Sequence, residues 1–156
     1  DGRIVSSTYI RKLIADGDME EAARYLGHPH TLSDTVHSGY HIGTKLGTPT
    51  INMHFPEGVI IPRHGVYAAK VYLEGGESYV AVTNVGIRPT VANGNSVTVE
   101  SHLLDYSGNL YGRQARVEFY KFLRPEKKFS GFEELSAQIR CDAESAKEYF
   151  ESADKK

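Results

Sequence analysis

Residues 39 to 52 include residue types that commonly bind phosphate groups. Gly39, Gly43 and Gly47 recur at intervals of four, and Lys45 supplies a cation between the last two. Glycines let a backbone adopt positive φ and approach a ligand closely, and the N–H groups of such a loop can form a concave anion site. An ordinary surface loop has a similar composition, so the loop alone leaves both interpretations open.

Thr50 and Asn52, which close this stretch, are candidates for holding a metal ion. Pro49 favours extended chain, and side chains two apart on an extended chain point the same way. A hydroxyl and an amide oxygen side by side are hard donors that suit magnesium. The stretch is not a Walker A loop, in which a lysine directly follows the last glycine and a helix then begins. Here Lys45 follows Gly43 by two residues, and Pro49 prevents a helix. A phosphate site here would therefore be built on β-structure.

Glu100 is the candidate for proton transfer. In the strand predicted for Val97–Leu104, alternation places Thr98, Glu100 and His102 on one face. A carboxylate held on a rigid strand can accept a proton or orient a hydroxyl group. A polar strand face is also what plain exposure to solvent produces, and this alternative stays open.

The segment from Leu123 to Phe129 could contact a ligand between the last strand and the terminal helix. Arg124 could pair with phosphate or with a carbonyl group, and Phe129 could pack against an aromatic ring. A solvated loop of mixed charge is the competing interpretation.

Composition bounds the class of protein. The net charge of −2 over 156 residues gives no support for a nucleic-acid surface. No apolar run approaches membrane-spanning length, and no signal peptide is visible. The single cysteine cannot form an internal disulfide, which suits a reducing compartment such as the cytoplasm.

The elements that would position these residues are mainly β. Alternating segments separated by turn signals, without intervening helices, predict an antiparallel barrel or sandwich. Two short helices capped by Ser6 or Ser7 and by Asp18 precede it, and a terminal helix should begin with a capping box of Ser130 and Glu133. An apolar stripe from Phe132 to Phe150 marks that helix. The predicted strands are His30–Ser38, Gly65–Leu73, Ser78–Val85, Val97–Leu104 and Gln114–Leu123, with a loop from Gly86 to Asn95.

Five motifs in this order resemble the riboflavin kinase module of bacterial bifunctional riboflavin kinase/FAD synthetases. They are G-x-x-x-G-x-x-x-G-x-P-T-I-N, V-G-I-R-P-T, V-E-S-H-L-L-D, L-Y-G and L-R-P-E-K-K-F. The likeness runs from about Pro29 to about Phe150. It implies a mainly β fold, a six-stranded antiparallel Greek-key-like barrel with a C-terminal helix, here preceded by the two short helices. Residues 29–156 would be the kinase domain, and residues 1–28 a helical remnant of an upstream adenylyltransferase module, without which this piece should not make FAD.

The resemblance also implies an activity, transfer of the ATP γ-phosphoryl group to riboflavin to give FMN and ADP. Glu100 matches the catalytic glutamate, and Thr50 and Asn52 match the pair that holds magnesium, with zinc or manganese as alternatives. Thr44 departs from the Arg or Lys that the family more often has, and Lys45 lies one place later. A flavin- or nucleotide-binding barrel without kinase activity is the alternative. The implied nucleotide-binding residues are Gly39, Gly43, Lys45, Thr50, Leu103, Asp105 and Tyr111, and the implied flavin-binding residues are Arg124, Lys127 and Phe129.

Overall fold

A single antiparallel sheet dominates the protein. The computed structural model describes residues 6–36, 50–90, 94–106 and 112–154. In these ranges two short helices precede six strands, and a long helix follows them. The helices are α1 (Ser7–Asp16), α2 (Met19–Leu26) and α4 (Phe132–Asp154), and the strands are β1 (His30–Thr35), β2 (Thr50–Met53), β3 (Gly65–Leu73), β4 (Ser78–Thr90), β5 (Gly94–Leu103) and β6 (Gln114–Arg124).

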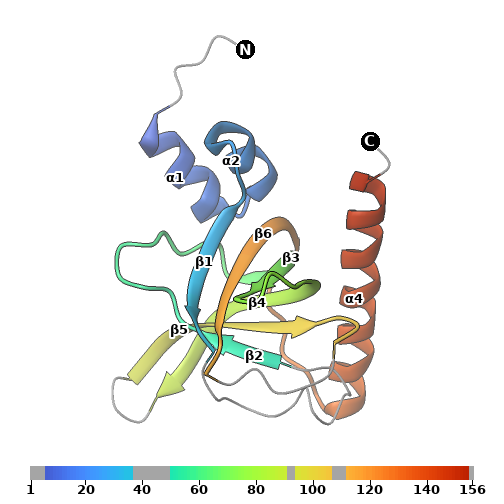
Figure 1. The fold of residues 1–156 in the computed structure, drawn as a ribbon. Helices are drawn as coiled ribbons and strands as arrows, with labels where there is room; N and C mark the ends of the chain where they lie inside the picture. Colours follow the sequence, from blue (N-terminus) through green and yellow to red (C-terminus); the bar gives the residue numbers. More distant parts are fainter. Residues whose placement is uncertain (1–5, 37–49, 91–93, 107–111, 155–156) are drawn as a thin grey trace.

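The sheet curls into a half-barrel (Figure 1). Its strand order is β1-β6-β3-β4-β5-β2, and all neighbours are antiparallel. Just after β2, the backbone N–H of His54 donates a 2.9 Å hydrogen bond to the Asp34 carboxylate on β1. This contact ties the two edge strands of the sheet to each other. The predicted six-stranded antiparallel barrel is confirmed in this partly open form.

The inner face of the half-barrel carries the main core. Alternate residues of each strand point inward, as the two-residue period of a strand requires. The buried hydroxyls of Thr83 and Ser101 bond each other at 2.8 Å, so both are paired within the core. The largest core side chains include Tyr67, Phe119, Leu32, Met53, Leu103, Val71, Val85 and Val99.

The two N-terminal helices begin at the caps that the sequence predicts. Ser6 caps α1 and Asp18 caps α2, each by accepting a hydrogen bond from a backbone N–H three residues on. Each helix is followed by a glycine in the left-handed conformation, Gly17 at φ 86° and Gly27 at φ 84°. The helices sit at one end of the half-barrel (Figure 1) and insert four side chains into its main core: Leu13, Ile14, Met19 and Ala22.

The terminal helix α4 covers part of the outer face of the sheet (Figure 1). Ala146 and Phe150 pack there on a second apolar cluster formed with Val66, Ala68 and Val82. None of the described helices is both long and apolar enough to cross a membrane. The outer face is therefore shared between this helix and the neighbouring polar strand residues.

Several details differ from the sequence-based expectations. β5 begins at Gly94 rather than at Val97, and β1 ends at Thr35 rather than at Ser38. β4 continues to Thr90 through the segment expected to be a loop, and it pairs with β5 along its full extension. The predicted capping box of Ser130 and Glu133 does not form, and the Ser130 hydroxyl instead donates to Glu134 at 2.7 Å. The reason is that α4 begins one residue later than the box requires: the Gly131 carbonyl accepts the first helical hydrogen bond, from the N–H of Leu135. Phe132, expected in the apolar stripe, is 50% exposed.

Candidate active site

Three polar residues form a row across three strands of the outer face. On β5, Glu100 lies opposite Asn52 of β2 on one side and opposite Asn84 of β4 on the other. Side chains directly opposite each other in antiparallel strands have Cβ atoms about 5 Å apart. The carboxylate of Glu100 is therefore flanked by an amide on each side.

A second row lies beside the first. Thr50 of β2 is opposite His102 of β5, and the Thr50 Oγ1 and His102 Nδ1 atoms are 2.9 Å apart. Burial lowers the pKa of His102, against the opposing influence of Glu100 and Asp142. A neutral imidazole can accept the hydroxyl hydrogen of Thr50 at Nδ1. The threonine oxygen then keeps its lone pairs for another partner.

The pair Thr50 and Asn52 has the chemistry of a magnesium site. The two side chains are half-buried and lie on the same face of β2, beside the Glu100 carboxylate. A hydroxyl and an amide oxygen are hard ligands, and magnesium accepts few protein ligands alongside phosphate oxygens and water. Zinc prefers thiolate and imidazole ligands, so this donor set fits magnesium better.

Asn84 contributes an unusual polar atom to the row. Its Oδ1 is buried and has no hydrogen-bond partner among the residues that the structure describes. Buried carbonyl oxygens in proteins are normally paired, so such an atom calls for an explanation. The motif-based analysis did not select Asn84, although it lies in strand β4 just before the V-G-I-R-P-T segment.

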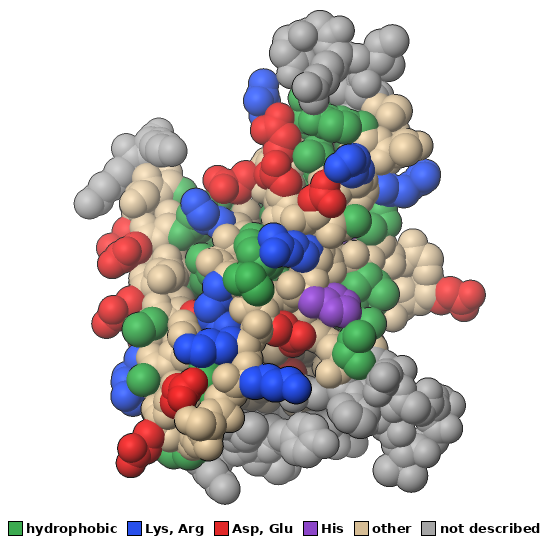
Figure 2. Space-filling view, turned by 180° about the vertical axis from the view of Figure 1, so that it is seen from behind, with side chains coloured by type: hydrophobic (Ala, Val, Ile, Leu, Met, Phe, Trp, Pro, Cys, Tyr) green, Lys and Arg blue, Asp and Glu red, His purple; other side chains and the backbone are tan. Residues whose placement is uncertain are grey.

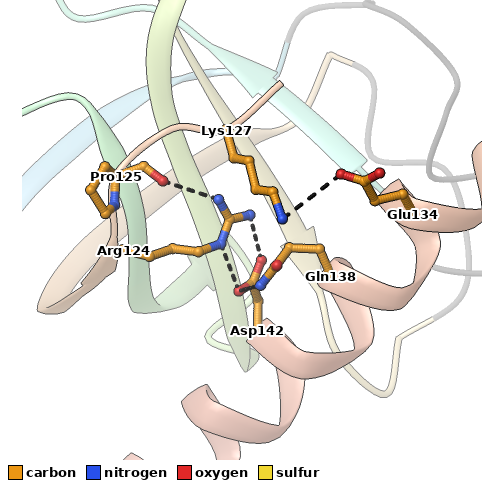
Figure 3. Close-up of polar contacts among 6 residues, drawn as sticks. All are labelled: Arg124, Pro125, Lys127, Glu134, Gln138 and Asp142. Atoms are coloured by element: carbon orange, nitrogen blue, oxygen red, sulfur yellow. Dashed lines mark hydrogen bonds and ion pairs between the residues drawn. The ribbon is translucent and has the colours of Figure 1, made fainter. Parts of the chain in front are cut away.

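Arg124, at the end of β6, is bound to the terminal helix. Its Nε and Nη2 groups donate to the two carboxylate oxygens of Asp142 at 2.9 and 2.8 Å, and Nη1 donates to the Pro125 carbonyl at 3.1 Å (Figure 3). Gln138, one turn earlier on α4, donates to the same carboxylate at 3.0 Å. Arginine has five N–H donors, so two remain for a ligand. The sequence-based predictions did not include Asp142. A carboxylate among the apolar residues of this helix is the feature that could have indicated a buried ion pair.

The loop after β6 contains the other residues predicted to bind flavin. The Lys127 ammonium and the Arg124 guanidinium lie 5.6 and 5.9 Å from the centre of the Phe129 ring. Lys127 also pairs with Glu134 of α4 at 3.8 Å (Figure 3). These contacts gather the three predicted residues into one cluster beside α4.

The same loop reaches back over β4. The Glu126 carboxylate lies where a Cβ on Gly86 would be, so the absence of a side chain at Gly86 permits this approach. Gly86 follows Asn84 by two residues and therefore shares its strand face. Figure 2 shows Lys and Arg side chains along the boundary between α4 and the sheet, with Asp and Glu side chains among them. The loop thus borders the row of Asn52, Glu100 and Asn84.

Other predicted nucleotide-binding residues are not gathered in this row. Leu103 is fully buried in the core on the inner face, so its side chain points away from Glu100. Asp105 lies in the turn after β5 with φ 59°, and its carboxylate is 3.6 Å from the Lys147 ammonium of α4. The remaining predictions, Gly39, Gly43, Lys45 and Tyr111, lie outside the described residues.

Comparison with protein families assigns the chain. A model of the Flavokinase family, described as riboflavin kinase, matches residues 26–150. A bifunctional riboflavin kinase/FMN adenylyltransferase from Haemophilus influenzae is 41% identical over 152 residues, covering 97% of this chain and 49% of the relative. The chain spans about half the length of the curated relatives it matches.

Solved structures show related folds. A Streptococcus pneumoniae protein described as a macrolide-efflux protein matches with a TM-score of 0.83 and 29% identity, over 92% of this chain and 46% of that chain. A riboflavin kinase from Trypanosoma brucei matches with a TM-score of 0.58 and 21% identity, over 80% of this chain and 81% of that chain, which supports the fold alone. The family match covers most of the chain and includes every row and loop described above. The chain therefore belongs to the riboflavin kinase family.

Proposed function

We propose that this chain transfers the γ-phosphoryl group of ATP to the terminal ribityl hydroxyl of riboflavin, giving FMN and ADP. The observation that carries the proposal is the position of Glu100, between Asn52 and Asn84 and next to Thr50. This arrangement puts a proton acceptor beside a pair of hard oxygen ligands, which phosphoryl transfer to a hydroxyl requires.

Glu100 acts as the general base. Its carboxylate accepts the proton of the terminal ribityl hydroxyl, and that oxygen forms a bond to the γ-phosphorus. The bond between the γ-phosphorus and the bridging oxygen breaks, and ADP leaves with the electron pair. A positioned general base contributes about 10²–10⁴-fold to such a rate.

Thr50 and Asn52 would hold the metal ion together with the nucleotide phosphates. With a neutral His102 accepting the Thr50 hydroxyl hydrogen at Nδ1, the threonine oxygen would keep its lone pairs for the metal ion, and the Asn52 amide oxygen would supply the second ligand. Magnesium bound there would neutralise charge on the phosphate oxygens. We propose magnesium rather than zinc because both ligands are hard neutral oxygens, a donor set that also suits manganese.

The loop from Arg124 to Phe129 would cover the flavin. Phe129 offers a ring that can stack on the isoalloxazine, and the free N–H groups of Arg124 can bond a flavin carbonyl. Covering the site excludes water, which would otherwise accept the phosphoryl group from ATP. The loop must open for FMN to leave, so we expect it to contribute to the turnover rate.

The relatives suggest a wider setting for this chain. Curated relatives are bifunctional and twice its length, so we propose that the parent protein also adenylylates FMN to FAD through a separate module, which would be the partner of this one. The chain has one cysteine, which suits a reducing compartment, so we propose that it acts in the cytoplasm.

Replacement of Glu100 by glutamine tests the assignment. Glu100→Gln keeps the size and polarity of the side chain but removes the proton acceptor. We expect binding of riboflavin and Mg-ADP within twofold of wild type and a loss of about 10²–10⁴-fold in kcat. Glu77→Gln, in the exposed β3–β4 turn, is the matched control and should turn over normally. Near wild-type turnover of Glu100→Gln would remove Glu100 from the role of base, whereas ligand binding without FMN formation by the wild type would support a non-catalytic binding barrel.

A further inference from the structure

We propose that Asn84 positions the flavin substrate, with its Oδ1 accepting a hydrogen bond from a secondary hydroxyl of the ribityl chain. This inference rests on the proposed function, because it assigns a neighbour to the hydroxyl that Glu100 deprotonates. It adds a specificity-determining residue on β4 that none of the sequence motifs includes.

The first reason is that the Asn84 acceptor is buried and unpaired. No described residue donates to Oδ1, and the atom is shielded from solvent. The residue directly opposite on β5 is Glu100, whose carboxylate when ionised is itself an acceptor only. We infer that a bound molecule supplies the donor that Oδ1 lacks.

The second reason is the arrangement of the two acceptors. Asn84 and Glu100 are directly opposite on β4 and β5, which places their Cβ atoms about 5 Å apart. A ligand that satisfies both needs two hydrogen-bond donors on neighbouring atoms. Consecutive hydroxyls of a polyol chain have this property, whereas phosphate groups of a nucleotide carry acceptors.

A metal ion at Asn84 fits less well. Asn52 and Asn84 lie on the two strands that flank β5, so two strand spacings, about 10 Å, separate their backbones. Magnesium binds its ligands at about 2.1 Å, so the two amides cannot easily share one ion. We therefore assign the metal to the β2 side of Glu100 and the ribityl chain to the β4 side.

The test compares two flavins on wild type and on Asn84→Ala. Riboflavin carries the ribityl chain, and lumiflavin has the same ring system with a methyl group in its place. A lost hydrogen bond of ordinary strength should weaken riboflavin binding by about 5–10-fold, measured by quenching of flavin fluorescence, and leave lumiflavin binding unchanged. Val82→Ala, which precedes Asn84 on the same strand face, is the control and should keep the ratio of the two affinities.

Several outcomes would overturn the inference. Equal loss of affinity for both flavins would place Asn84 against the ring, and weaker binding of Mg-ADP would place it at the nucleotide or the metal. Unchanged riboflavin affinity would leave Asn84 without a role. The free energy of unfolding provides a further check: removal of an unpaired buried amide oxygen should not lower it, and a loss would indicate a structural hydrogen bond. If wild type binds riboflavin but makes no FMN, the proposed function fails independently of the affinity ratio.

Discussion

Replacement of Asp142 by alanine should destabilise the protein by removing the anchor between the loop after β6 and helix α4. The Asp142 carboxylate is 6% exposed and accepts two hydrogen bonds from Arg124 and one from Gln138. Loss of one partner from a buried ion pair costs about 3–5 kcal/mol because the other charge stays behind uncompensated. The Arg124 side chain is 21% exposed and can partly rehydrate, so we expect about 3 kcal/mol.

Urea unfolding monitored by circular dichroism measures the change in the free energy of unfolding, and thermal unfolding measures the change in Tm. A loss of about 3 kcal/mol should lower Tm by about 6–12 °C in a chain of this size. Gln138→Ala is the matched control, because it removes one neutral donor to the same carboxylate and should cost about 1 kcal/mol. The double variant Arg124→Met with Asp142→Leu should recover most of the loss, since it removes both charges together. A loss below 1 kcal/mol for Asp142→Ala would refute the anchoring argument.

Three further predictions follow from the structure. Gly86→Ala should push the Glu126 carboxylate and its loop outward, raising the KM for riboflavin while the free energy of unfolding changes by less than about 1 kcal/mol; an unchanged KM would count against a covering loop. Burial lowers the pKa of His30, whose Nε2 forms a 2.9 Å hydrogen bond with the Ile60 carbonyl. Because the unfolded state then binds more protons than the folded state, the free energy of unfolding should fall as pH drops below about 6.5. His30→Gln should flatten that dependence in urea titrations at several pH values, and an equally steep profile would exclude His30 as its source. Asn52→Ala should weaken Mg-ADP binding in calorimetry but spare lumiflavin, and equal affinity for Mg-ADP would contradict a metal ligand at this position.

The local elements were largely predictable from the sequence. The strand Gly65–Leu73 has the predicted bounds and the second helix begins after its predicted cap, Asp18, because alternation and a capping residue are both local signals. The extension of β4 to Thr90 was not predicted, since Pro89 is a strong loop signal. Pairing with β3 ends at Val85. Among the described strands Pro89 therefore pairs only with β5, and its missing N–H breaks no bond to β3.

The candidate site was predictable only in part. Alternation put Glu100 and His102 on one face, and a similar argument aligned Thr50 with Asn52. The sequence could not predict that Asn52 and Asn84 flank Glu100, because the register between distant strands is absent from local patterns. Leu103 was selected by motif position alone, and its burial on the inner face follows from the same alternation that exposes Glu100 on the other.

The most direct test of the central claim is transfer of label from ATP to flavin. The purified chain should be incubated with riboflavin, magnesium and ATP labelled at the γ-phosphate, and the products separated by chromatography. We predict that the label appears in FMN, in an amount equal to the ADP formed, and that Glu100→Gln slows the formation of both products by about 10²–10⁴-fold. Formation of ADP with the label in inorganic phosphate alone, or no labelled FMN from folded protein that binds both substrates, would contradict the assignment of this chain as a riboflavin kinase.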